Sequence, residues 1–161
     1  MNLGLENKVI MVTGGARGIG EGIVRALAGE GAIPVIIGRN AGDNRKLQEE
    51  LERGGRPGFS VQAELNDPTA CEAAVHAVVK KFGRIEGLVN NAGVNDGVGL
   101  ENGNYERFMK SLHSNLVHYY MMAHFALAHL KKSRGAIVNI SSKTAETGQG
   151  NTSAYAAANG G

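Results

Sequence analysis

The chain has 161 residues, 42% of them hydrophobic, which is enough to bury a core and excludes an intrinsically disordered protein. Lys and Arg together number 17 and Asp and Glu 15, and the resulting net charge of +2 excludes the strongly basic surface typical of nucleic-acid binding. With Cys71 as the only cysteine, no apolar run of membrane-spanning length and no signal-peptide pattern, we expect a cytoplasmic protein without disulfides or membrane contact.

Apolar runs alternate with amphipathic segments along the chain. We expect strands at residues 8–13, 33–38, 59–63, 85–90 and 135–140, and helices at residues 18–29, 43–53, 68–82 and 104–132. This alternation predicts right-handed crossovers and a doubly wound, Rossmann-like parallel sheet between two helical layers, as one αβα domain over residues 1–161. Ligands of such sheets bind beyond the carboxyl ends of the strands.

A glycine-rich turn, Thr13-Gly-x-x-x-Gly18-x-Gly20, follows the first expected strand and opens the first expected helix. A helix that begins in such a turn presents backbone N–H groups to a phosphate. We expect Gly14 to allow the sharp turn, Gly18 to admit a pyrophosphate and Gly20 to let the helix pack closely. The turn therefore predicts a dinucleotide site.

The second strand indicates which dinucleotide is preferred. An acidic residue at its end binds the ribose of NAD, whereas an arginine accommodates the 2′-phosphate of NADP. Here Gly38 is followed by Arg39, and Arg17 in the glycine turn supplies a second cation. We therefore expect a preference for NADP(H), with NAD(H) also possible.

These features together resemble the short-chain dehydrogenase/reductase family. The matching residues are the glycine turn, Asn90-Asn91-Ala92-Gly93, Asn115, Ser142, and Tyr155 at the usual family spacing from Ser142. Within the family, residues 140–153 resemble the branch that contains L-fucose dehydrogenases. The resemblance implies an oxidoreductase that interconverts a secondary alcohol, such as a sugar, and its carbonyl by hydride transfer.

The resemblance also implies roles for individual residues. Tyr155 is expected to act as the acid/base, Ser142 to bond the substrate oxygen, and Asn115 to hold a water in a proton relay. Cofactor contacts are expected from Thr13, Gly14, Ala16, Arg17, Gly18, Ile19, Gly20, Arg39, Glu64, Leu65, Asn91, Ala92 and Gly93. For Glu64, a solvated carboxylate is an equal alternative. Asp96, Lys143 and Gln149 are expected on the substrate side, where polar groups suit a sugar.

Two departures from the family pattern leave alternatives open. Asn159 stands where the family has a catalytic lysine, and the chain ends at Gly161, inside the helix expected to carry Tyr155. Family members continue with two more strands. We therefore keep two alternatives to the dehydrogenase: a fragment or pseudoenzyme that binds nucleotide without turnover, and a reductase of 3-oxoacyl or quinone carbonyls.

The long helix at residues 104–132 carries an apolar stripe and several histidines. We expect the stripe to be core, and it comprises Phe108, Leu112, Leu116, Tyr119, Ala123, Leu127 and Leu130. We expect the histidines to be surface or interface residues without a metal, and these are His113, His118, His124 and His129. In the family this helix builds a subunit interface, which implies a homodimer or homotetramer.

Overall fold

The computed structural model describes residues 3–161 and contains a five-stranded parallel sheet in the order β3-β2-β1-β4-β5. The strands are β1 (Val9–Thr13), β2 (Ile33–Gly38), β3 (Phe59–Gln62), β4 (Gly87–Asn90) and β5 (Ala136–Asn139). Each expected strand is present, although four of the five are shorter than expected by one or two residues. The order reverses between β1 and β4, which makes this edge the topological switch point of the sheet.

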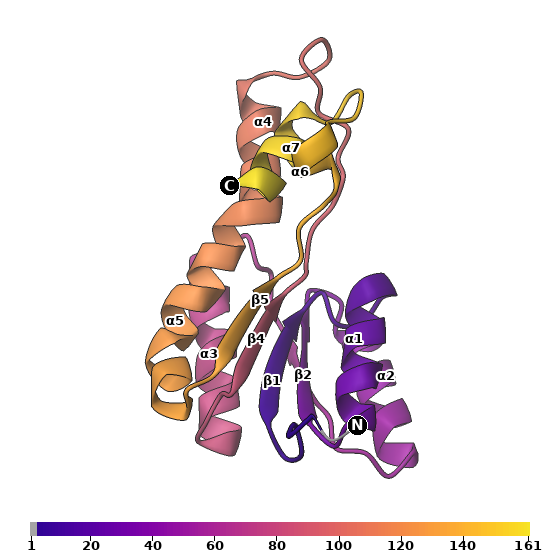
Figure 1. The fold of residues 1–161 in the computed structure, drawn as a ribbon, viewed down its shortest axis with the longest axis vertical. Coiled ribbons are helices and arrows are strands. Elements are labelled where there is room, and N and C mark those ends of the chain that lie inside the picture. Colours follow the sequence, from indigo (N-terminus) through magenta and orange to yellow (C-terminus); the bar gives the residue numbers. More distant parts are fainter. Residues whose placement is uncertain (1–2) are drawn as a thin grey trace.

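Helices cover both faces of the sheet (Figure 1). They are α1 (Gly18–Gly29), α2 (Ala41–Arg53), α3 (Pro68–Phe82), α4 (Tyr105–Leu112), the π-helical η1 (His113–Val117), α5 (His118–Ser133), α6 (Thr144–Thr147) and α7 (Ser153–Gly160). Helices α1 and α2 pack on one face, and α3 and α5 on the other. The expected three-layer αβα fold is confirmed.

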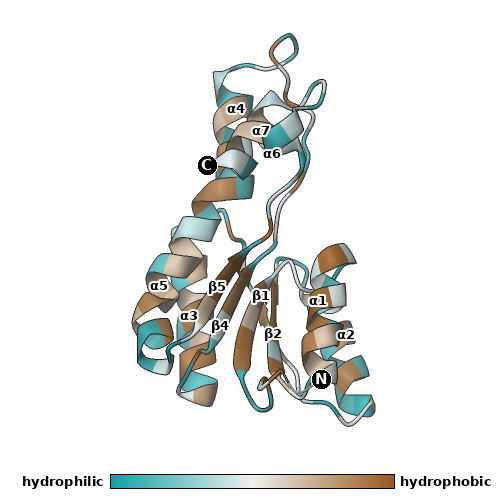
Figure 2. Ribbon diagram, viewed as in Figure 1, coloured by the Kyte–Doolittle hydropathy of each residue, from teal (hydrophilic) through white to brown (hydrophobic). Residues whose placement is uncertain are grey.

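Alternating strand residues build one hydrophobic cluster on each face of the sheet, because successive side chains of a strand point to opposite sides. Met11 and Val35 pack with α3 and α5, whereas Val12 and Ile36 pack with α1 and α2. The strands are accordingly drawn mostly in brown in Figure 2, between helices whose outer surfaces carry teal residues. No helix within residues 3–161 is long and apolar enough to cross a membrane.

The long helix differs from expectation in two ways. Its α-helical path is interrupted by η1, a π-helical turn of the kind found at functional sites. Its most buried face consists of Ser111, Asn115, His118, Met122, Ala126 and Leu130. The expected core positions Phe108 and Leu127 are instead 37% and 43% exposed. The prediction was wrong for these two positions, because small and polar residues occupy much of the buried face and a pattern of large apolar residues does not detect them. It was correct for Leu130, which lies in the core, and Ala123 packs against the same cluster.

The glycine turn is held by a very close approach of backbone atoms. Gly14 has φ 62°, a left-handed conformation that favours glycine. A Cβ atom on Gly20 would lie 2.2 Å from the Gly14 carbonyl oxygen and 2.6 Å from Asn91 Nδ2. Gly20 therefore packs against the turn and the segment after β4, and no larger residue fits there without a backbone shift.

This contact predicts opposite effects of two alanine substitutions in α1. Gly20→Ala should lower the free energy of unfolding by about 2–3 kcal/mol, because the added Cβ overpacks against backbone. Gly22→Ala is the matched control, since a Cβ there meets nothing within 4 Å. In an exposed helical position it should stabilise by about 0.5–1 kcal/mol. Denaturant unfolding of both variants measures the two changes in the free energy of unfolding. Equal changes in the two variants would contradict the close packing described at Gly20.

Candidate functional site

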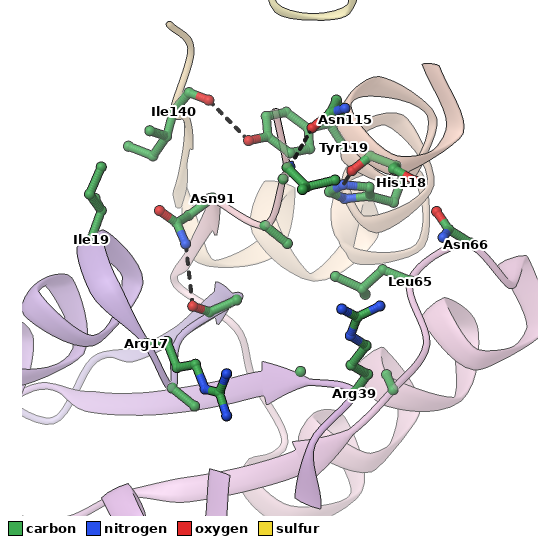
Figure 3. A pocket seen from close by; sticks show the side chains of 18 of the residues that line it. Arg17, Ile19, Arg39, Leu65, Asn66, Asn91, Asn115, His118, Tyr119 and Ile140 are labelled. Atoms are coloured by element: carbon green, nitrogen blue, oxygen red, sulfur yellow. Dashed lines mark hydrogen bonds between the residues drawn. The ribbon is translucent and has the colours of Figure 1, made fainter. Parts of the chain in front are cut away.

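A cleft of about 640 Å³ opens at the carboxyl edge of the sheet, where the strand ends were expected to meet (Figure 3). Of the expected site residues, those that line it are Gly14, Ala16, Arg17, Ile19, Arg39, Glu64, Leu65, Asn91, Ala92, Gly93, Asn115, Tyr155 and Asn159. Those outside its lining are Thr13, Gly18, Gly20, Asp96, Ser142, Lys143 and Gln149. Lining residues that sequence reasoning did not identify include Asp43, Asn44, His118 and Tyr119.

Thr13 and Asn91 fasten β1 to the segment after β4. The Thr13 hydroxyl oxygen accepts hydrogen bonds from the backbone N–H groups of Asn91 at 2.9 Å and Ala92 at 3.1 Å. Asn91 Nδ2 in turn donates to the Thr13 carbonyl oxygen at 2.9 Å. Thr13 is fully buried, so it supports the wall of the cleft from behind.

Asn90 makes the equivalent connection between β4 and β5. Its Nδ2 donates to Asn139 Oδ1 at 3.0 Å and to the carbonyl oxygen of Tyr119 at 3.2 Å. The paired asparagines thus tie neighbouring strands together. The β4 end is thereby fixed relative to both β5 and the long helix.

The end of β2 combines an exposed arginine with a buried asparagine. The Arg39 side chain points toward Leu65 in Figure 3, and it makes no hydrogen bond or ion pair with any residue in the described range 3–161. Below it, Asn44 Nδ2 donates to the carbonyl oxygens of Gly38 at 2.8 Å and Val61 at 3.3 Å. A Cβ on Gly38 would lie 3.0 Å from Asn44 Oδ1, so Asn44 crowds the place where an acidic side chain at position 38 would begin.

Arg17 is engaged by a partner that the sequence did not reveal. Its Nη2 lies 2.6 Å from the Asp43 carboxylate in the first turn of α2. Glu64, by contrast, is exposed at the end of β3, where its Oε1 accepts from the Asn66 backbone N–H at 3.2 Å. Both Glu64 and Leu65 line the cleft beyond β3.

Asn115 lies in the π-helical turn and holds the loop that follows Asn91. Its Oδ1 accepts from the Val94 backbone N–H at 2.7 Å, and its Nδ2 donates to the Ser111 carbonyl oxygen at 3.0 Å. A Cβ on Gly93 would lie 2.9 Å from Asn115 Oδ1, so a larger residue there would force the Asn115 amide or the loop to shift. The Asn115 side chain thus fixes the cleft wall.

Helix α7 brings Tyr155 and Asn159 into the cleft by packing against α4 and η1 (Figure 1). Asn159 Nδ2 donates to the Tyr155 carbonyl oxygen at 2.8 Å, back within its own helix. Ser141 Oγ donates to the Asn159 carbonyl oxygen at 2.7 Å. The neighbouring Ser142 Oγ accepts from Thr144 Oγ1 at 2.9 Å at the start of α6, a helix that sequence reasoning missed.

Tyr119 supports the β5 end from the long helix. Its hydroxyl donates to the Ile140 carbonyl oxygen at 2.9 Å, immediately before Ser141 (Figure 3). Burial, and to a lesser degree the negative charge that Tyr155 can carry, raises the pKa of Tyr119 to about 12. Tyr119 therefore stays a protonated donor in the neutral range.

His118 corrects one sequence prediction, because it is 2% exposed rather than at the surface. Its Nε2 lies 3.0 Å from the Ser114 carbonyl oxygen, and its buried Nδ1 has no hydrogen-bond partner among the described residues. Burial lowers the pKa of His118. The apolar pattern of the helix does not mark this position as buried, because the preceding buried residue on the same face, Asn115, is also polar.

The expected substrate-side residues lie around the loops above the cleft. Asp96 accepts from Ser111 Oγ at 3.1 Å, whereas Lys143 and Gln149 are exposed. Within residues 3–161 no group of three His, Cys, Asp or Glu side chains is arranged to hold a metal ion.

Comparisons with known proteins agree on one family. The family model for short chain dehydrogenases matches residues 8–161. The chain is 35% identical over 156 residues to an L-fucose dehydrogenase of Mus musculus, covering 96% of this chain and 56% of that protein. It is 36% identical over 154 residues to an L-fucose dehydrogenase of Oryctolagus cuniculus, covering 95% and 53%. The chain thus spans about half the length of these curated relatives.

A solved structure gives the same result for the fold. The crystal structure of the dehydrogenase Cj0485 superposes with a TM-score of 0.91 at 42% sequence identity, covering 99% of this chain and 61% of that chain.

The burial of His118 predicts a pH-dependent stability. An unfolded histidine titrates near ~6.5, and the folded protein binds this proton only at lower pH. The free energy of unfolding should therefore fall as the pH drops below ~6.5, by at most about 1.4 kcal/mol per pH unit from this residue. His118→Gln should reduce the loss of stability between about pH 7 and pH 5 in thermal melts.

The exposed His113 on the same long helix provides the control. His113→Gln should leave the pH dependence as it is in the unaltered protein. If His118→Gln also leaves it unchanged, His118 is not the buried neutral group described above.

Proposed function

The chain belongs to the short-chain dehydrogenase family, and on that premise we propose that it forms the dinucleotide-binding part of an oxidoreductase. The reaction proposed is the interconversion of a secondary alcohol and its carbonyl by hydride transfer, with NADP(H) preferred over NAD(H). The observation that carries the proposal is the cleft at the switch point, which is lined by part of the glycine turn and by Arg39, whose side chain is unpaired within the described range 3–161. Ligands of doubly wound sheets bind at this place.

The geometry of the glycine turn supports a pyrophosphate site. Gly18 has φ 54°, and a Cβ built on it would meet nothing within 4 Å, so the space above it is open to a ligand. No side chain in the described part of the chain caps the N-terminus of α1, whereas Asn40, Asp67 and Asn104 cap α2, α3 and α4. The backbone N–H groups at the start of α1 are thus available to a phosphate.

The preference for NADP(H) is supported by the β2 end. Arg39 presents a guanidinium that has no partner within residues 3–161, and a guanidinium binds phosphate through several N–H donors in a fixed plane. Gly38 carries no carboxylate to accept from a ribose hydroxyl, and Asn44 crowds that position. These contacts favour a dinucleotide with a 2′-phosphate.

In the proposed reaction the bound nicotinamide supplies or accepts the hydride. Tyr155 exchanges the proton of the alcohol, and Ser142 bonds the substrate oxygen. Asn115 fixes the Val94 loop beside them. Asn159, where the family has lysine, brings no positive charge to favour the deprotonated form of Tyr155, and its amide bonds its own helix. Proton transfer to Tyr155 is therefore the step that this chain supports least.

The substrate proposed is a polyhydroxylated alcohol such as a sugar. Similarity to L-fucose dehydrogenases supports this class, and Asp96, Lys143 and Gln149 are the polar residues proposed to contact it.

The competing function is a nucleotide-binding protein without turnover, which the Asn159 geometry favours. Homo-oligomers are proposed through the long helix, where Tyr120 and Leu127 are 67% and 43% exposed.

The cofactor preference makes a testable prediction at Arg39. Arg39→Ala should weaken NADPH binding by roughly 1.5–3 kcal/mol, the usual worth of a charge-assisted hydrogen bond, and leave NADH binding nearly unchanged. Fluorescence titration of both cofactors measures this. Arg45→Ala removes the same charge from the exposed side of α2, outside the cleft, and should affect neither. Equal losses for both cofactors, or an initial preference for NADH, would refute the proposed preference.

A second prediction concerns Asn159 in the protein that contains this chain. Alcohol oxidation should be slow at neutral pH, because Asn159 supplies no positive charge to assist proton transfer to Tyr155. Asn159→Lys should raise the neutral rate by about 10²–10⁴-fold, the usual range for acid/base catalysis. Rates with NADP⁺ and a panel of sugars, measured across the pH range, test this.

Ala157→Lys is the control, because it adds the same charge to an exposed position of α7. It should leave the rate unchanged. An asparagine form that is already fully active at neutral pH, or a lysine form without any gain, would show that this account of the site is wrong.

A further inference from the structure

Two arginines reach the cleft from neighbouring strand ends, but they differ in their partners. Arg39 makes no ion pair within residues 3–161, whereas Arg17 Nη2 lies 2.6 Å from Asp43 Oδ2. All three residues line the same cleft. The cleft therefore holds one unpaired cation, and one cation that is bound to an anion of the protein itself.

Asp43 is the more firmly held member of the ion pair. It lies in the first turn of α2, where its backbone N–H donates to Asn40 Oδ1 at 3.1 Å. A carboxylate near a helix N-terminus is stabilised by the helix dipole. Its side chain is 29% exposed, against 76% for Arg17. The Asp43 charge is thus a fixed part of the cleft rim, and the Arg17 guanidinium extends to meet it.

We propose that Asp43 is a specificity-determining residue that weakens binding of the 2′-phosphate of a dinucleotide. It does so by holding Arg17 and by adding a negative charge beside the phosphate position. The inference rests on the proposed function, since it concerns the same dinucleotide site. Asp43 would thereby reduce the difference in affinity between a dinucleotide with the 2′-phosphate and one without it, although two arginines line the cleft.

The physical basis is the difference in charge between the two ligands. A 2′-phosphate brings up to two negative charges to the ribose, and like charges side by side disfavour binding. An unphosphorylated ribose brings none, so its binding is insensitive to Asp43. Exposed ion pairs are individually weak, so Arg17 can leave Asp43. We therefore expect a several-fold effect on affinity rather than exclusion of the phosphate.

The test is calorimetric titration of the Asp43→Asn variant with four probes: 2′,5′-ADP, 5′-ADP, NADPH and NADH. The two probes with a 2′-phosphate should bind about threefold to tenfold more tightly than to the unaltered protein, and the other two should change less than about twofold. The gain should shrink at high salt, because exposed charges are screened. Asp43→Ser is the second variant if Asp43→Asn does not fold.

A second ion pair supplies the matched control. Arg25 Nη2 in α1 lies 2.6 Å from Glu50 Oε2 in α2, but neither residue lines the cleft. Glu50→Gln removes the same charge and should change none of the four affinities. Arg17→Gln should weaken 2′,5′-ADP binding more in the Asp43→Asn background than in the unaltered protein, because Arg17 is then released to the phosphate.

The outcomes separate this inference from the proposed function. Weaker 2′,5′-ADP binding after Asp43→Asn would overturn the inference, because Asp43 would then be holding Arg17 in place for the phosphate. An equal gain for all four probes, or no change, would overturn it as well. If the unaltered protein bound none of the four probes, the proposed function would fail, and the inference would fail with it.

Discussion

The cleft depends on how closely the backbone at Gly20 approaches the turn after β1. A Cβ at Gly20 would overlap the Gly14 carbonyl oxygen and the Asn91 amide. Thr13 and Asn91 bond each other across the same junction, so the start of α1 and the ends of β1 and β4 form one rigid unit. Because this unit lies at the switch point of the sheet, it sets the position of the central wall of the cleft.

The charges around the cleft are distributed unevenly. At the β2 side Arg39 is unpaired within residues 3–161, while Arg17 is held by Asp43. At the α7 side, Asn159 is uncharged and its amide donates to the Tyr155 carbonyl oxygen within the same helix. Under the proposed function, the site is therefore better equipped to bind an anionic dinucleotide than to remove a proton from an alcohol. Binding of the dinucleotide and removal of the alcohol proton are therefore separable properties of the site.

Sequence reasoning was most accurate where a local signal determines the structure. Strand positions, the glycine turn and the meeting of strand ends follow from apolar runs, glycine spacing and parallel topology, and all are present. It was wrong at His118, which is buried by its surroundings in the fold. The Arg17–Asp43 ion pair and the π-helical turn at Asn115 were also not predicted, because both depend on how distant segments pack.

The most direct test of this account is a crystal structure of the protein that contains this chain, grown with NADP⁺. The account predicts the pyrophosphate against the turn from Gly14 to Gly20, with the 2′-phosphate within hydrogen-bond distance of the Arg39 guanidinium. Tyr155 should lie on the nicotinamide side of the same cleft. A cleft that stays empty at saturating dinucleotide, or a dinucleotide bound elsewhere on the molecule, would contradict it.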